Sequence, residues 1–188
     1  MTSSSQNLGE LHIIMGPMFS SKTTTLISKL DRHTFGQSVL AINHELDTRY
    51  SMEGLRTHDG KSFPCLRASS LKSVFDDPLY KNADVVGIDE SQFFGDLVPN
   101  VKIMVEAHNK IVYVAGLNGS FRRELFGTIH ELIPWADSVL LLNAVCMECH
   151  DGKTPGIFSK LIANKTDSGD VFIGGSAQYK AVCRRHFQ

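Results

Sequence analysis

The stretch LHIIMGPMFSSKT, residues 11–23, decides the fold. Its first half is an apolar run of strand length, and after a Gly/Pro/Ser turn residues 22–33 have the apolar spacing of a helix. Gly16 to Thr23 follows the P-loop pattern G-x-x-x-x-G-K-[ST], with Ser21 in place of the second glycine. In this pattern, backbone N–H groups at the start of a helix surround phosphate oxygens. The stretch therefore predicts a strand–loop–helix unit that binds the phosphates of a nucleotide.

The residue types in this loop have separate tasks. Lys22 supplies a positive charge to the terminal phosphates, and the Thr23 hydroxyl is a ligand for Mg²⁺. Ser21 is small enough for the loop to close, and we expect some backbone strain there. The predicted phosphate-binding residues are Gly16, Pro17, Met18, Phe19, Ser20, Ser21, Lys22 and Thr23.

Further apolar runs of strand length occur at residues 38–43, 83–88, 110–115 and 138–142, and residues 97–109 have helical spacing. Strands that alternate with helices are typical of βαβ units and of a mainly parallel sheet with helices on both faces. The composition changes after Val145. We predict an α/β fold with a disordered tail over 1–9, a nucleotide-binding domain over 10–145 and a small metal-stapled domain over 146–188.

Asp89 and Glu90 directly follow the apolar run that ends at Ile88. In P-loop proteins an Asp after such a strand holds Mg²⁺ beside the phosphates. Side chains alternate along a strand, so we expect Asp89 and Glu90 to point in different directions and to have different roles. Asp89 is predicted to face Mg²⁺, and Glu90 to take a proton from an attacking hydroxyl or water.

Two short motifs in the last part of the chain indicate a metal site. Cys146-x₂-Cys149 and Cys183-x₂-His186 each bring two ligands to one ion, and together they complete a tetrahedral Cys₃His set. A closed set of four protein ligands is typical of structural Zn²⁺. Cys65 has no such partner in the sequence and is predicted to be an inert thiol.

Composition limits the class of protein. The chain has 188 residues, and 19 Lys and Arg against 20 Asp and Glu give a formal net charge of −1. This balance argues against a protein that coats nucleic acid or an anionic membrane. The apolar runs are far shorter than the ~20 residues of a membrane helix, and the first residues lack a signal-peptide pattern. We expect a cytoplasmic protein with no nucleic-acid and no membrane partner.

Three segments are candidates for binding a second substrate. Leu117 to Phe121 follow a predicted strand, where open α/β sheets place ligands. Val171 to Gly175, with the nearby Tyr179, could present backbone groups to the edge of a base, and Arg49 in the long polar loop could reach phosphates.

The strings GPMFSSKT, DTRY, THD, IDESQFF, VCMEC and IGG, in this order, resemble the zinc-containing (type II) thymidine kinases over about residues 11 to 187. The resemblance implies a RecA-like P-loop domain, a zinc-bearing domain with a lid over the nucleoside, and a homotetramer. It also implies transfer of the ATP γ-phosphoryl group to the 5′-hydroxyl of thymidine or deoxyuridine, with Mg²⁺, in pyrimidine salvage.

The resemblance assigns residue roles at matching positions of this chain. Glu90 would be the general base and Asp89 the Mg²⁺ residue, and Asp47, Thr48, Arg49 and Gln92 would join the P-loop on the ATP side. The zinc ligands would be Cys146, Cys149, Cys183 and His186. The nucleoside would be lined by Met18, Phe93, Leu117, Phe121, Asp170, Val171, Phe172, Ile173, Gly174 and Tyr179.

The chain departs from the family's familiar form at four positions. Ser21 and Ser91 stand where that form has glycine, which bears on the rate, and Asp170 and Phe172 lie in a usually aliphatic stretch, which bears on base selectivity. Two alternative functions belong to other classes of protein. One is a RecA-like P-loop ATPase acting on nucleic acid, with Glu90 activating water; the other is a zinc-ribbon nucleic-acid binder with a vestigial P-loop.

Overall fold

The computed structural model describes residues 8–47, 65–162 and 178–188. Within these residues a six-stranded parallel sheet has the strand order β3-β2-β4-β5-β1-β6. Its central strands are almost fully buried because they carry near-continuous runs of Val, Ile and Ala, as expected for a parallel sheet covered on both faces. The strands are β1 (Glu10–Gly16), β2 (Val39–His44), β3 (Cys65–Ala68), β4 (Val85–Ile88), β5 (Ile111–Leu117) and β6 (Ser138–Leu141).

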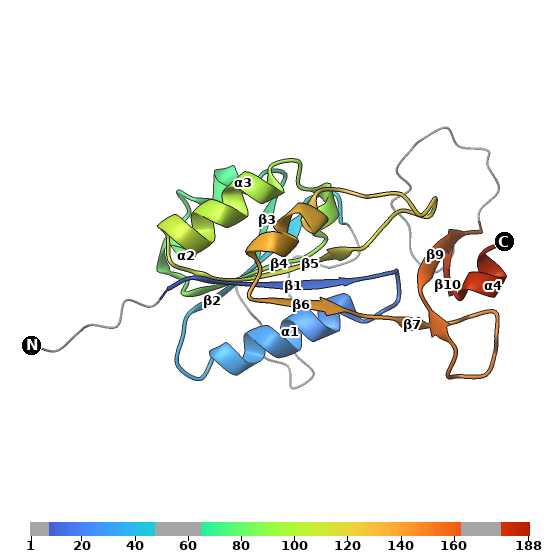
Figure 1. Cartoon of the computed structure of the whole chain (residues 1–188). Helices are drawn as coiled ribbons and strands as arrows, with labels where there is room; N and C mark the ends of the chain where they lie inside the picture. Colours follow the sequence, from blue (N-terminus) through green and yellow to red (C-terminus); the bar gives the residue numbers. More distant parts are fainter. Residues whose placement is uncertain (1–7, 48–64, 163–177) are drawn as a thin grey trace, which may run out of the picture.

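Helices cover both faces of this sheet (Figure 1). Helix α1 (Lys22–His33) lies on one face, where Leu26 and Leu30 are fully buried against Ile14. The opposite face is covered by α2 (Pro78–Asn82), α3 (Leu97–Lys102) and η4 (Ile129–Trp135), which bury the larger hydrophobic cluster. Shorter helical segments are η1 (Lys72–Val74), η2 (Ser91–Phe93) and η3 (Ile103–Ala107).

The predicted α/β fold is confirmed, with two differences in its elements. The segment expected to be one helix over 97–109 is α3 followed by the π-helical stretch η3. Strand β3 was not expected from the sequence, because it has only four residues and follows a long polar segment. It is a strand because it pairs in parallel with β2, from Ala41↔Cys65 to His44↔Ala68. Cys65, the predicted inert thiol, is therefore half-buried at the start of an edge strand.

Strand β6, at the other edge, leaves apolar side chains exposed. Val139, Leu140 and Leu141 have exposed fractions of 42%, 39% and 59%. Only one of the strand's two long edges is paired in the described part of the chain, with β1. No helix in the described ranges is long and apolar enough to cross a membrane.

The last part of the chain forms two small antiparallel pairs and a short helix beyond the carboxyl ends of β1 and β6 (Figure 1). Its elements are β7 (Ala144–Val145), β8 (Pro155–Gly156), β9 (Phe158–Leu161), β10 (Tyr179–Val182) and α4 (Arg184–Phe187). β7 lies just before the predicted domain boundary at 145/146. Its two residues, Ala144 and Val145, nevertheless pair with β8 of the small module.

Candidate active site and metal centre

The loop between β1 and α1 has the backbone of a phosphate-binding loop. Ser21, immediately before α1, has φ 61° and ψ 31°, in the left-handed region that favours glycine. Its carbonyl oxygen accepts bonds from the backbone N–H of Thr25 at 2.9 Å and the Thr25 hydroxyl at 2.8 Å, which joins the loop to the first turn of α1. Ser21 thus closes the loop in the conformation expected of the missing glycine, with the backbone strain that the sequence predicts.

The polar side chains of this loop bond within it. The Ser20 hydroxyl donates to the Pro17 carbonyl oxygen at 2.8 Å, and the Lys22 Nζ donates to the same oxygen, also at 2.8 Å. Lys22 therefore lies across the loop that leads into the N-terminus of α1. A phosphate there would meet the lysine charge and the positive end of the helix dipole together.

Asp89 connects this loop to β4. The Thr23 hydroxyl donates a 2.7 Å hydrogen bond to Asp89 Oδ2, and Asp89 is only 1% exposed. Burial raises the pKa of Asp89 to about 6, the neighbouring charge of Glu90 adds to the rise, and the Thr23 hydrogen bond opposes it. A buried carboxylate beside a hydroxyl offers the hard oxygen ligands that Mg²⁺ prefers, and a cation would offset the unfavourable burial. These two side chains therefore fit a magnesium ion.

Asp89 and Glu90 both lie beyond the end of β4, so the expected strand alternation does not apply to them. β4 ends at Ile88, and Glu90 has φ 49°, a left-handed conformation outside the strand. The Glu90 N–H donates to Asp89 Oδ1 at 2.9 Å, so one carboxylate is anchored by the backbone of the next residue. The half-exposed Glu90 side chain remains the candidate base beside the buried Asp89.

Gln92 lies two residues further, in η2, and is 5% exposed. Its Nε2 donates to Glu90 Oε2, and its Oε1 accepts the N–H of Leu117 at 3.1 Å. The family resemblance assigns Gln92 to the ATP side and Leu117 to the nucleoside side. The bond between them depends on β4 and β5 being neighbours in the sheet, which spacing along the chain does not reveal.

Asp47, predicted on the phosphate side, is 1% exposed just after β2. Asn43 Nδ2 donates to Asp47 Oδ2 at 3.1 Å, and the Arg67 guanidinium donates to the Asp47 carbonyl oxygen at 2.7 Å. Sequence reasoning missed both Asn43 and Arg67, since neither belongs to a recognisable motif. Thr48 and Arg49 lie outside the described residues.

The predicted nucleoside residues come from both parts of the chain. The rings of Phe121 and Tyr179 are 6.3 Å apart between centroids, and the backbone N–H of Met18 donates to Ser159 Oγ at 2.9 Å. Ser159, in β9, is a contact that the sequence did not indicate. A cavity of about 600 Å³ lies between residues 118–125 and 157–159.

Two further predicted nucleoside residues end their elements: Leu117 is the last residue of β5, and Phe93 is the last residue of η2. The Phe93 ring packs edge-on against Phe126 at 5.8 Å between centroids. The remaining predicted nucleoside residues, Asp170, Val171, Phe172, Ile173 and Gly174, lie outside the described residues.

The four predicted zinc ligands converge at one point. The ligand atoms of Cys146, Cys149, Cys183 and His186 all lie within 4.8 Å of one another. His186 Nδ1 is 3.4–3.6 Å from the three sulfurs, and the Cys149 and Cys183 sulfurs are 3.8 Å apart. A tetrahedral zinc with ordinary bond lengths requires S···N and S···S edges of about 3.5 and 3.8 Å. The donor set therefore fits Zn²⁺, with His186 and not His150 as the fourth ligand.

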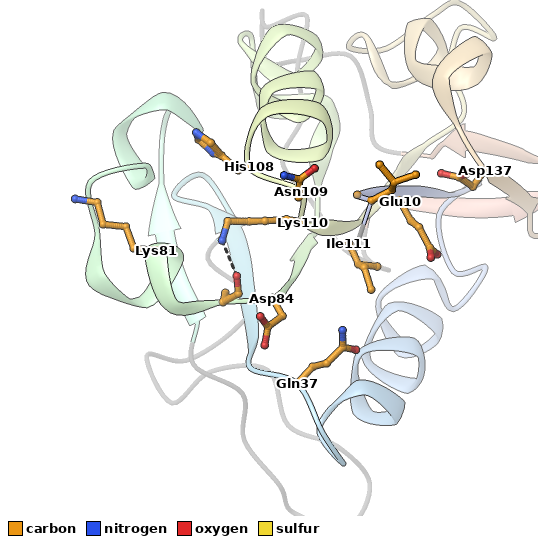
Figure 2. Close-up of a pocket in the computed structure, with 12 residues that line it drawn as sticks. Glu10, Gln37, Lys81, Asp84, His108, Asn109, Lys110, Ile111 and Asp137 are labelled. Atoms are coloured by element: carbon orange, nitrogen blue, oxygen red, sulfur yellow. Dashed lines mark hydrogen bonds between the residues drawn. The ribbon is translucent and has the colours of Figure 1, made fainter. Parts of the chain in front are cut away.

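A second cavity, of about 740 Å³, lies at the opposite end of the strands. Figure 2 shows Glu10, Asp84 and Lys110 around it, close to the amino ends of β1, β4 and β5. The Lys110 ammonium donates to the Ala83 carbonyl oxygen at 2.6 Å (Figure 2). Because parallel α/β sheets bind ligands at the carboxyl ends of their strands, this cavity is separate from the candidate active site.

Comparison with known proteins gives one consistent result. A family model described as thymidine kinase matches residues 9–187. The thymidine kinase of Myxoma virus (strain Uriarra) is 41% identical over 178 residues, covering 94% of this chain and 95% of the viral protein. Thymidine kinase a of Arabidopsis thaliana is 40% identical and is covered over 75% of its length. A Gallus gallus protein named "Thymidine kinase, cytosolic" is 38% identical, with 75% of its length covered.

Proposed function

This chain belongs to the thymidine kinase family, and from that premise we propose that its site transfers the γ-phosphoryl group of ATP to the 5′-hydroxyl of thymidine. The observation that carries the proposal is the contact between the phosphate-binding loop, after β1, and Asp89, after β4, at the carboxyl ends of two strands that both pair with β5. Phosphoryl transfer requires in-line positioning and neutralisation of charge more than covalent help from the protein. In the proposed reaction, residues on the donor side neutralise charge, and residues on the acceptor side position the hydroxyl group.

On the donor side, the backbone from Gly16 to Thr23 and the Lys22 ammonium hold the ATP phosphates. Thr23 and Asp89 would hold a magnesium ion, which would neutralise negative charge on the ATP phosphates. The 2.7 Å hydrogen bond between Thr23 and Asp89 supports this assignment, because it brings the two proposed magnesium ligands together. Asp47, Thr48 and Arg49 are proposed to complete this side. The resemblance also assigns Gln92 to it, and the Gln92 amide bonds to Glu90 and to the Leu117 N–H.

On the acceptor side, Glu90 accepts the proton of the 5′-hydroxyl as the hydroxyl oxygen forms its bond to the γ-phosphorus. The bond from that phosphorus to the β,γ-bridging oxygen breaks, and ADP leaves with the electron pair. Glu90 suits the role because it lies beside Asp89 yet remains partly open to solvent. In the alternative function, a nucleic-acid-dependent ATPase, Glu90 would instead activate a water molecule. Membership of the thymidine kinase family argues against this alternative.

The nucleoside is proposed to bind between the end of β5 and the small module. Met18, Phe93, Leu117, Phe121 and Tyr179 are the described residues for this side, and the Phe121–Tyr179 ring pair supports it because such rings can pack against a flat base. Backbone groups of residues 170–174 are proposed to contact the edge of the base. Deoxyuridine, which lacks only the thymine methyl group, is proposed as a second substrate.

The zinc ion is proposed to be structural. Four protein ligands leave no open position for a substrate, so bound zinc would link the β7–β8 pair to α4. The division into a tail over 1–9, a nucleotide domain over 10–145 and a zinc and lid domain over 146–188 is retained as a proposal.

A homotetramer is also proposed. The exposed apolar strand β6 supports self-association, because an unpaired apolar edge is an unfavourable surface for a lone subunit. A cytoplasmic location is proposed from the Gallus gallus relative, whose name includes the word cytosolic.

The test is a coupled assay of ADP release with thymidine, deoxyuridine, deoxycytidine and purine nucleosides as acceptors. Thymidine is expected to stimulate ADP release and to yield its 5′-monophosphate. ATP turnover that responds to DNA but to none of these nucleosides would refute the proposed reaction.

A further inference from the structure

Both ends of the Gln92 amide are held within the protein. The backbone N–H of Leu117 can only donate, so it meets the amide oxygen, and this turns the amide NH₂ toward the Glu90 carboxylate. Gln92 is 5% exposed, so water cannot replace these partners easily. The side chain therefore links the end of β5 to the residue that follows Asp89.

The backbone around Gln92 leaves it little freedom to move. A Cβ on Gly116 would lie 3.1 Å from Gln92 Oε1 and 2.2 Å from the hydroxyl oxygen of the fully buried Ser91. A Cβ on Gly127, whose φ is +68°, would lie 2.6 Å from Gln92 Cα. Two glycines thus allow two other backbone segments to approach this turn closely. The position of the amide is fixed by packing as well as by hydrogen bonds.

We propose that Gln92 is a positioning residue that orients the Glu90 carboxylate toward the acceptor hydroxyl. The inference rests on the function proposed above, in which Glu90 is the general base. By holding one carboxylate oxygen, the amide fixes the orientation in which the Glu90 carboxylate can accept a proton. Gln92 itself transfers no proton, because a neutral amide is neither an acid nor a base at physiological pH.

A positioning role predicts different effects on kcat and on the KM for ATP. Misplacing a catalytic group by about 1 Å can cost ~10²-fold in rate without weakening substrate binding. Loss of Gln92 should therefore lower kcat, and it should leave the KM for ATP nearly unchanged. A Gln92 that instead bound ATP directly would raise that KM.

The experiment is a double-mutant cycle between positions 92 and 90. Gln92→Met keeps the length of the side chain and removes both hydrogen bonds. Gln92→Glu keeps an acceptor for the Leu117 N–H but removes the donor to Glu90. Each variant is expected to lower kcat by ~10- to 100-fold, with the KM for ATP within about threefold. In the Glu90→Gln background, either change should lower kcat by less than about threefold more, because the group being positioned is gone.

A matched control is Gln37→Met, since Gln37 bonds to His33 near the opposite end of the strands and should leave kcat unchanged. Thermal melting of every variant separates a loss of fold from a loss of positioning, and Gln92→Glu keeps the test valid if Gln92→Met does not fold. Full additivity with Glu90→Gln, or a raised KM for ATP with an unchanged kcat, would overturn the inference alone. An unchanged kcat in Glu90→Gln by itself would overturn the proposed base and this inference with it.

Discussion

The Thr23 hydroxyl, in the first turn of α1, lies 2.7 Å from Asp89 Oδ2, at the end of β4. This contact brings the phosphate-binding loop to a carboxylate that is almost completely buried. The fold therefore places an acidic side chain where its charged form is unfavourable. Its stability should depend on whether that side chain is charged.

Asp89→Asn is expected to stabilise the apoprotein at pH 7.5. The pKa of Asp89 is raised to about 6 by burial and by Glu90, so the native state binds more protons than the unfolded state between about pH 4 and 6. The free energy of unfolding therefore falls as the pH rises through this window, by up to about 2–3 kcal/mol from this group. Melting in EDTA should show the Asp89→Asn variant to be more stable than the wild type at pH 7.5, with no such advantage below pH 4.

The control for this pH dependence is Asp84→Asn. Hydrogen bonds from the Ser38 backbone and hydroxyl lower the pKa of Asp84, so this carboxylate stabilises the fold above its unfolded pKa and loses that effect as the pH falls. Asp84→Asn should therefore destabilise the protein at pH 7.5. An Asp89→Asn variant that is less stable than the wild type at every pH would show that the bonds to Thr23 and the Glu90 N–H outweigh the buried charge.

Ser21→Gly is expected to raise the melting temperature. A non-glycine residue in the left-handed region costs about 1–2 kcal/mol, which the substitution relieves. The greater conformational entropy of glycine in the unfolded chain offsets part of this stabilisation. A net gain of ~0.5–1 kcal/mol corresponds to about 1–4 °C for a chain of this size. Ser28→Gly, inside α1 with ordinary helical geometry, is the matched control and should lower the melting temperature. Equal shifts in both variants would contradict a strained Ser21.

Cys146→Ser should remove one tightly bound zinc per chain and lower the melting temperature by more than about 5 °C. The reason is that a structural ion contributes its binding free energy to folding, and three remaining ligands hold it less well. Zinc content by elemental analysis and melting with and without a chelator measure both effects. Cys65→Ser, in the half-buried strand β3, should keep the zinc. Full zinc occupancy in Cys146→Ser would exclude Cys146 as a ligand.

Leu141→Lys should reduce the oligomeric state. Leu141 is 59% exposed on the unpaired edge of β6, and a lysine there is a common means of blocking strand association. Light scattering after gel filtration measures the change. Leu125→Lys is the control, since Leu125 is 69% exposed but lies outside β6. The same mass for the Leu141→Lys variant and the wild type would exclude this edge as the interface.

Most of the sheet and helix α1 could be predicted from the sequence because their apolar periodicity is strong. Helix α1 begins at Lys22 and ends at His33, the bounds predicted from its spacing. β3 could not be predicted, since its four residues become a strand only through pairing with β2. The zinc ligands were predictable because two residues spaced for one ion occur twice.

The arrangement around Glu90 was beyond sequence reasoning. The left-handed turn at Glu90 and the bond from Gln92 to Leu117 both depend on how η2 packs against the end of β5. The spacing of residue types within a short segment does not reveal a contact between two residues that are 25 positions apart in the chain, as Gln92 and Leu117 are. The sequence identified which residues have the needed chemistry, and the fold decides which of them act on one another.

The place of β1 in the sheet has a consequence for the order of folding. Both sheet neighbours of β1 come much later in the chain, Ile111–Leu117 on one side and Ser138–Leu141 on the other. A growing polypeptide thus carries its complete nucleotide loop long before the strand that supports it can pair. Such distant pairings are slow to form, and the exposed apolar segment is prone to aggregate in the meantime. The nascent chain should therefore gain affinity for ATP late in synthesis and depend on chaperones until then.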